Sequence, residues 1–194
     1  MIENEIYLIE QAKIGDGNAF TQLVKYYSPK IYNLSLRMMQ NKADAEDVLQ
    51  EAFLIMMQKL HTFEGRSSLY TWLYRVATNV ALEKLKNKHR VNITASIDDP
   101  NYEKMGNVEP YEIPNFDEKE LTNEQFKYHL GKGMEKLNEN LKAVFILRDI
   151  EGHSVKETAE ILDISESNVK VRLMRARLSL RDELSEKFKK EGWV

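Results

Sequence analysis

The segment 154–177 constrains the fold more than any other part of the chain, because it is typical of two short helices separated by a tight turn. Ser154 and Glu157 have the spacing of a capping box, in which each side chain bonds the other residue's backbone at a helix start. Asp163 lies in the turn, and Asp tolerates the left-handed backbone better than most residues. Ser165 is a favoured N-cap for the second helix. The pattern predicts a helix-turn-helix.

The second helix of this segment has an apolar side and a basic side. Its apolar side is one stripe at helical spacing, formed by Val169, Leu173, Ala176 and Leu180. Most of its cations fall outside that stripe, namely Lys170, Arg172, Arg175, Arg177 and Arg181. So many cations on one helix favour phosphate binding, and residues 166–170 at its start would be directed at base edges in the major groove of DNA. The alternative interpretation is a solvated basic face on an ordinary amphipathic helix.

The composition limits the class of protein. The 194 residues allow one large domain or two small ones. Cys is absent, which excludes disulfides and thiolate chemistry and agrees with a cytoplasmic location. The net charge of −3 argues against a uniformly basic nucleic-acid coat, so positive charge must be concentrated locally. The chain start lacks signal-peptide character, and no apolar run approaches the about 20 residues of a membrane span. We therefore predict no membrane segment.

Helical periodicity dominates the chain, and Gly and Pro are scarce. We expect helices near residues 4–14, 17–27, 29–40, 43–60, 68–88, 119–137, 138–151, 154–162 and 166–188. The Ser28-Pro29 pair is interpreted as a helix start that separates the second helix from the third. Residues 91–118 hold three Pro and many acids without a period, which favours a flexible acidic linker. The prediction is an all-α chain with two small helical domains, residues 1–90 and 119–194.

The first domain has two further surfaces. Residues 44–53 begin a helix with an acidic outer face, whose acids either complement the helix dipole or dock a basic protein helix. Residues 69–79 interleave aromatic and polar side chains, so that Trp72 and Tyr74 either pack in the core or stack on bases. The same helix ends in a basic run, 84–90, suited to DNA phosphates or to the helix C-terminus.

Catalysis is not expected. No two of the four His residues have metal-ligand spacing, and no Gly-rich phosphate loop occurs. We therefore predict no enzyme activity, no metal, no cofactor and no small-molecule substrate.

The order of these motifs supports a resemblance. An acidic DAEDVLQEAF helix is followed by FEGRSSLYTWLYRVATNVALEKLK, an acidic linker and ISESNVKVRLMRARLSLRDEL. Over nearly the whole chain this order resembles the extracytoplasmic-function (ECF) sigma factors, which are two-domain initiation factors of bacterial RNA polymerase. The resemblance implies that residues 1–90 form a sigma region-two-like domain that binds the polymerase and recognises and melts the minus-ten element. It implies that residues 119–194 form a region-four-like domain that recognises the minus-thirty-five element.

The resemblance also implies roles for individual residues. The residues expected to bind the clamp helices of the polymerase β′ subunit are Asp44, Glu46, Asp47, Gln50 and Glu51. The residues expected to meet the minus-ten element, including a loop that captures a flipped base, are Phe63, Glu64, Gly65, Arg66, Ser67, Trp72, Arg75, Asn79 and Lys86. The residues expected to meet the minus-thirty-five element are Ser167, Asn168, Lys170, Val171, Arg172, Met174, Arg175 and Arg177.

Within the last set, Arg172 and Arg177 are expected to grip phosphate or support the helix. Val171 and Met174 can contact a thymine methyl but cannot hydrogen-bond a base. The expected partners are core RNA polymerase (β′ clamp helices and β flap), promoter DNA and an anti-sigma factor. The alternative function is a helix-turn-helix regulator that binds duplex DNA without being a polymerase subunit.

Overall fold

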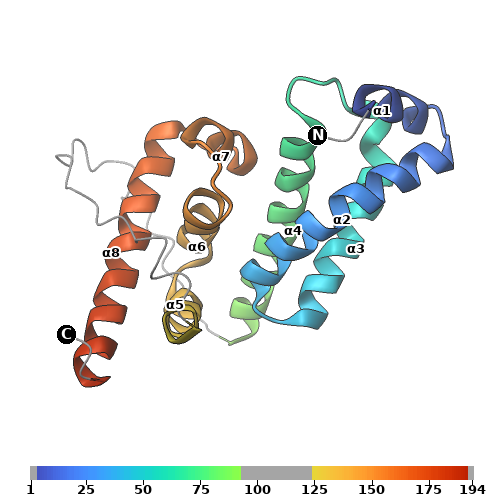
Figure 1. Cartoon of the computed structure of the whole chain (residues 1–194). Coiled ribbons are helices and arrows are strands. Elements are labelled where there is room, and N and C mark those ends of the chain that lie inside the picture. Colours follow the sequence, from blue (N-terminus) through green and yellow to red (C-terminus); the bar gives the residue numbers. More distant parts are fainter. Residues whose placement is uncertain (1–3, 93–123, 192–194) are drawn as a thin grey trace.

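The computed structural model describes residues 4–92 and 124–191, and all regular structure in these ranges is helical. The N-terminal unit contains α1 (Glu5–Lys13), α2 (Gly17–Met39), α3 (Lys42–Lys59), the 3-10 turn η1 (Leu60–Thr62) and α4 (Leu69–Asn92). The C-terminal unit contains α5 (Glu124–Lys136), α6 (Glu139–Phe145), the π-helical turn η4 (Ile146–Ile150), α7 (Val155–Leu162) and α8 (Glu166–Glu191). Figure 1 shows the two units side by side. The all-α prediction is confirmed.

Two predicted boundaries need comment. The predicted linker 91–118 begins inside α4, which continues to Asn92, and the rest of that linker lies outside the described residues. The predicted start of the second domain, 119–123, also lies outside them, and the first described residue of the C-terminal unit is Glu124.

The predicted break at Ser28-Pro29 is wrong. One continuous helix, α2, runs through Pro29, and the Ser28 hydroxyl donates to the Val24 carbonyl 2.7 Å away instead of capping a new helix. The apolar stripe explains why the helix continues, because its buried residues keep their spacing on both sides of the Pro: Leu23, Tyr27, Ile31, Leu34 and Met38. Burial of five large side chains offsets the cost of about 3 kcal/mol for an internal Pro.

The core of the N-terminal unit lies where α2, α3 and α4 pack together (Figure 1). The predicted core side of α3 is confirmed, since Val48, Ala52 and Met56 are fully buried. Helix α4 supplies Leu73 and Ala81 to the same core. Because α4 packs against α2 and α3 on one side and against α6 and α7 on another, it is the central helix of the molecule.

The π-helical turn η4 shapes the C-terminal unit. It interrupts the predicted helix 138–151 after Phe145, and the Glu151 amide bonds the Ile146 carbonyl five residues earlier at 2.8 Å. Gly152 follows with φ +75°, a conformation that favours Gly. The wide turn and this Gly direct Glu151 and His153 towards the N-terminal unit, which both contact.

No helix among residues 4–92 and 124–191 is both long and apolar enough to cross a membrane.

Candidate nucleic-acid interface

The helix-turn-helix expected from the sequence is formed by α7 and α8. The Ser154 hydroxyl accepts from the Glu157 amide at 3.1 Å, and the Glu157 carboxylate accepts from the Ser154 amide at 2.8 Å. These bonds, with that of the Ser154 side chain second, lower the pKa of Glu157. Asp163 adopts the left-handed conformation at φ 55° and ψ 48°. The predicted capping box and turn are therefore confirmed, and they fix the direction in which α8 leaves α7.

The start of α8 is capped by the predicted Ser. The Asn168 amide donates to the Ser165 hydroxyl at 3.2 Å, and the Ser167 hydroxyl lies 3.0 Å from the same oxygen. Ser167 and Asn168, two of the residues expected at the minus-thirty-five element, thus belong to the cap of the helix. Their side chains lie at its N-terminal end, where unpaired amides and the helix dipole favour a negatively charged group such as phosphate.

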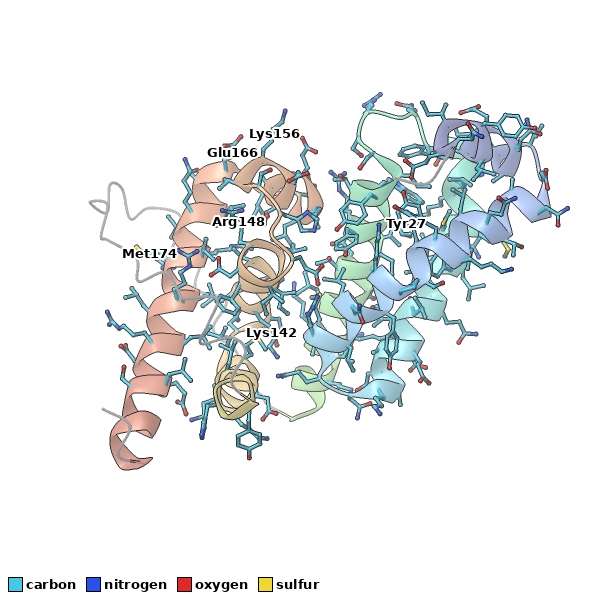
Figure 2. All side chains as sticks on the ribbon, viewed as in Figure 1. Tyr27, Lys142, Arg148, Lys156, Glu166 and Met174 are labelled. Carbon is cyan, nitrogen blue, oxygen red and sulfur yellow. The ribbon has the colours of Figure 1, made fainter. Side chains whose placement is uncertain are left out.

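The two sides of α8 are separated as the sequence predicts. Val169, Ala176 and Leu180 are fully buried against the rest of the unit, and Leu173 is nearly so. Lys170 is exposed, and the neighbouring residues of the expected reading face are half-buried, namely Val171, Arg172, Met174 and Arg175. Figure 2 shows Met174 on the side of α8 that faces away from α6. The outer side of α8 therefore presents a mixed basic and apolar surface.

Arg177 has a structural partner. Its Nε and Nη2 donate to the two carboxylate oxygens of Asp149 at 2.7 and 2.6 Å, and both side chains are less than one fifth exposed. This bidentate geometry is the strongest form of ion pair. It ties α8 to η4, in agreement with the helix-supporting role that was one of two expected for Arg177.

The residues of α4 that were assigned to the minus-ten element share one face of the helix, because they recur at intervals of three, four and seven. Asn79 and Lys86 are exposed, and Trp72 is half-buried with its ring 5.8 Å from that of Phe63. Arg75 is half-buried, and its Nε is fully buried with no hydrogen-bond partner among the described residues. The face carries an aromatic ring, two cations and an amide, which are groups that bind single-stranded nucleic acid.

The loop before α4 has one anchored end. Phe63 is buried and packs on Trp72, with Lys13 Nζ 5.7 Å from its ring centre. Glu64 and Arg66 form an exposed ion pair at 2.6 Å around Gly65, whose φ is +73°. Ser67 is half-buried. Phe63 therefore supports the loop, and the open part of it is formed by residues 64–66.

Tyr74 packs in the interior. It is 1% exposed, its ring lies 4.3 Å from that of Tyr70, and burial raises its pKa. The choice that the sequence left between packing and base stacking is decided for packing in this conformation. Trp72, which keeps a half-exposed ring, retains both contacts.

The outer face of α3 is acidic but partly paired within the chain. Asp44 forms an ion pair with Lys88, and Lys84 Nζ lies 3.6 Å from Asp47 and 3.7 Å from Glu51. The Lys84 pairs are long and exposed, so they contribute little stability and separate readily. Glu46 and Gln50 are exposed. All the residues expected at the polymerase interface lie on the outer side of α3.

Two apolar residues extend this acidic face and were missed in the sequence. Leu54 is 46% exposed and Met57 is 58% exposed, although the helix around them has a buried side. They follow Gln50 by four and seven residues, which places them on the same side of α3. That spacing was the signal, but apolar residues in an amphipathic helix are usually assigned to the core.

Within residues 4–92 and 124–191, no group of three or more Asp, Glu and His residues is arranged to hold a metal ion.

Comparison with known proteins identifies the family. The profile described as Sigma-70 region 2 matches residues 23–91, and the profile described as Sigma-70, region 4 matches residues 130–180. The chain is 34% identical over 173 residues to the ECF RNA polymerase sigma-E factor of Escherichia coli, covering 88% of each chain. It is 32% identical over 180 residues to the protein of the same name from Haemophilus influenzae, covering 91% of this chain and 93% of the relative. The chain belongs to the ECF sigma factors.

Solved structures share the fold of this ECF sigma factor. CnrH in complex with the cytosolic domain of CnrY matches with a TM-score of 0.66 at 21% identity, covering 95% of this chain and 99% of CnrH. The sigma factor RpoE in complex with the anti-sigma factor NepR from Bartonella quintana matches with a TM-score of 0.60 at 20% identity. This match covers 86% of this chain and 96% of RpoE.

Proposed function

We propose that this ECF sigma factor binds core RNA polymerase and directs it to promoters through two separate DNA contacts. The observation that supports this most is the presence, in one chain, of an acidic outer face on α3 and a basic outer face on α8, in the order of regions 2 and 4. A regulator that only binds duplex DNA would use α8 and leave the surface of α3 without a role. We expect the protein to act in the cytoplasm and to catalyse no reaction itself.

In the proposed complex, residues 1–90 dock on the β′ clamp helices through α3. Glu46 and Gln50 are exposed and the Lys84 pairs are weak, so the acids are available to a basic partner surface. Leu54 and Met57 would add apolar contact next to the acids. Polymerase binding then depends on both charge and apolar area, and the β flap would hold the C-terminal unit.

The proposed DNA contacts differ in kind. The loop 63–68 and the face of α4 that bears Trp72 and Asn79 would hold the melted minus-ten strand, because they combine an aromatic ring, a cation and hydrogen-bonding groups. The start of α8 would enter the major groove at the minus-thirty-five element, where Lys170 and Arg175 meet phosphate or guanine. The polymerase would hold both contacts in place together and so raise their joint affinity.

An anti-sigma factor is the further proposed partner. The support is that two structures with this fold are sigma complexes of this kind by their own descriptions, CnrH with CnrY and RpoE with NepR. Co-expression of the chain with proteins encoded beside it, followed by co-purification, tests the proposal.

The central experiment mixes the purified chain with core polymerase and a library of promoter fragments. We expect co-elution with the polymerase and transcripts from a defined set of start sites. Asp47→Ala with Glu51→Ala should weaken co-elution about tenfold without changing the start sites, since exposed charges mainly affect association. The matched control is Glu135→Ala, which removes an exposed acid from α5 that also pairs with a Lys. Absence of both co-elution and specific transcripts would leave the duplex-DNA regulator as the better description.

A further inference from the structure

The two units of the chain are joined by polar side chains from both. Arg37 of α2 forms an ion pair with Glu151, and the Tyr74 hydroxyl of α4 donates to the other carboxylate oxygen of Glu151 at 3.2 Å. At the other end of the contact, the Gln40 amide donates to the Gly131 carbonyl at 2.8 Å and accepts from Lys142 Nζ at 3.2 Å. We call Arg37, Gln40, Tyr74, Lys142 and Glu151 the closing contact.

His153 lies beside the closing contact and adds an aromatic part to it. Its ring is 5% exposed and lies 5.1 Å from the ring of Tyr74 and 5.5 Å from that of Tyr70. Its backbone carbonyl accepts from Arg148, which holds the loop after η4 against the unit. Figure 1 shows α4 beside α6 and α7 at the border of the two units, and Figure 2 shows Lys142 at the same border.

The chemistry of this border is that of a contact that separates. Interfaces between domains that move are more polar than obligate ones. Four buried side-chain atoms in the described ranges lack a hydrogen-bond partner: Arg75 Nε, Thr78 Oγ1, Arg148 Nε and Thr158 Oγ1. All four lie on α4, η4 and α7, which are elements that meet between the units. Buried unpaired polar atoms lower the stability of a contact relative to a satisfied core.

The proposed function requires the units to separate. The minus-ten and minus-thirty-five elements are about 25 base pairs apart by name, which is about 85 Å at 3.4 Å per base pair. A compact chain of this length has a radius of gyration of about 16 Å and a width of about 40 Å. The chain has the means to open, because covalent geometry lets a connection the length of residues 93–123 reach about 100 Å.

We propose that the closing contact holds the free sigma factor in a closed state, and that its opening is the step that makes both promoter contacts available. This inference rests on the proposed function only for its consequence; the closed state itself is a property of the free chain. The Arg37–Glu151 pair sets the equilibrium from one end, because breaking it leaves Glu151, whose side chain is 12% exposed, without its cation. The Gln40–Lys142 bond sets it from the other end.

The test measures the distance between the units in the full-length chain. The chain has no Cys, so Asn33→Cys and Lys156→Cys place two fluorophores, on exposed positions of α2 and α7. Single-molecule energy transfer without polymerase should show one short-distance population. Arg37→Glu or Glu151→Arg should raise the ratio of open to closed chains about tenfold, the effect of losing one charged hydrogen bond, and the double exchange should restore most of the closed population.

The controls keep the test decisive. Lys132→Glu and Glu135→Arg make the same charge changes in an exposed pair of α5 and should leave the distance unchanged. Gln40→Leu tests the other end of the contact if a charge variant does not fold, as judged by circular dichroism. A long distance in the unmodified chain, or equal distances in the chain and all closing-contact variants, would overturn the proposal.

A second readout separates this inference from the proposed function. With polymerase and promoter DNA at limiting sigma factor, the opened variants should give more specific transcript than the unmodified chain. If no variant and no unmodified chain supports transcription, the proposed function fails, while the distances still decide the closed state. If transcription occurs but the opened variants give no increase, opening is not the step that limits promoter use.

Discussion

The two helices expected to meet DNA, α4 and α8, are supported in different ways. Helix α4 packs against α2, α3, α6 and α7, so most of its surface is internal and its proposed DNA face is a narrow strip. Helix α8 lies at the edge of the molecule, packs on α5, α6 and α7 along one side, and presents the other side outward (Figure 1). In α4 stability and DNA contact are therefore coupled within one helix, whereas in α8 they are divided between two sides.

The largest expected effect tests the core role of α4. Leu73→Ala removes a fully buried side chain and should lower the free energy of unfolding by about 3 kcal/mol. Asn79→Ala, on the exposed strip of the same helix, should change it by less than about 0.5 kcal/mol. Urea denaturation measures both. Equal losses would mean that the strip and the core side of α4 are not distinct.

A smaller effect tests the division within α8. Arg177→Ala breaks the bidentate pair with Asp149 and should cost about 2 kcal/mol of unfolding free energy. Lys170→Ala should leave stability within about 0.5 kcal/mol but reduce the salt dependence of DNA binding by about one ion. Thermal denaturation and binding titrations at several salt concentrations compare the two. A stability loss for Lys170→Ala as large as that for Arg177→Ala would remove the distinction.

The pH dependence of stability tests how closely α4 depends on the C-terminal unit. Burial among Tyr70, Tyr74 and its own loop lowers the pKa of His153 below its ordinary 6.5, with opposing and supporting effects from Glu157 and Arg148. The unfolded chain therefore binds this proton first as pH falls, and stability is lost below about pH 6.5, by at most about 1.4 kcal/mol per pH unit.

His153→Phe keeps a ring between the two Tyr rings and removes the proton. Between pH 7 and pH 5, the unfolding free energy of the unmodified chain should fall more steeply than that of the variant. Parallel curves would show that His153 is not buried in its neutral form in solution.

The smallest expected effect tests the support that α7 gives to α8. Ser154→Ala removes the capping box and should cost about 1 kcal/mol near neutral pH. Because the cap lowers the pKa of Glu157, its contribution is present above the unfolded pKa of 4.5 and is lost as pH falls through the lower folded value. The difference between the two proteins in chemical denaturation should therefore shrink in acid. Ser179→Ala, an exposed position within α8, is the matched control.

The sequence predicted features that depend on neighbours in the chain. The capping box at Ser154, the left-handed Asp163 and the buried stripe of α8 all follow from residues within two or three turns of each other, and all are confirmed. Continuity through Pro29 was not predicted, because the local signal of Ser-Pro contradicted the longer apolar stripe, and burial decided the outcome. The roles assigned to individual polymerase and promoter contacts stay predictions, since they depend on molecules other than this chain.

The closing contact was beyond sequence reasoning for a different reason. Arg37 and Glu151 are 114 residues apart, and neither belongs to a motif. The exposed Leu54 and Met57 were likewise hidden, because periodicity gives the face of a helix but not which faces find a partner. What the sequence lacked in both cases was the packing of distant elements.

The π-helical turn η4 makes the register of the C-terminal unit sensitive to chain length. Such a turn holds one residue more than an α-helical path would need. Deleting one residue of 146–150 would convert it to ordinary helix and rotate everything after it by about 100° relative to α6. Glu151 and His153 would then be carried away from Arg37 and Tyr74, although every side chain of the closing contact would still be present in the sequence. A single inserted residue thus specifies which side of the C-terminal unit meets α4.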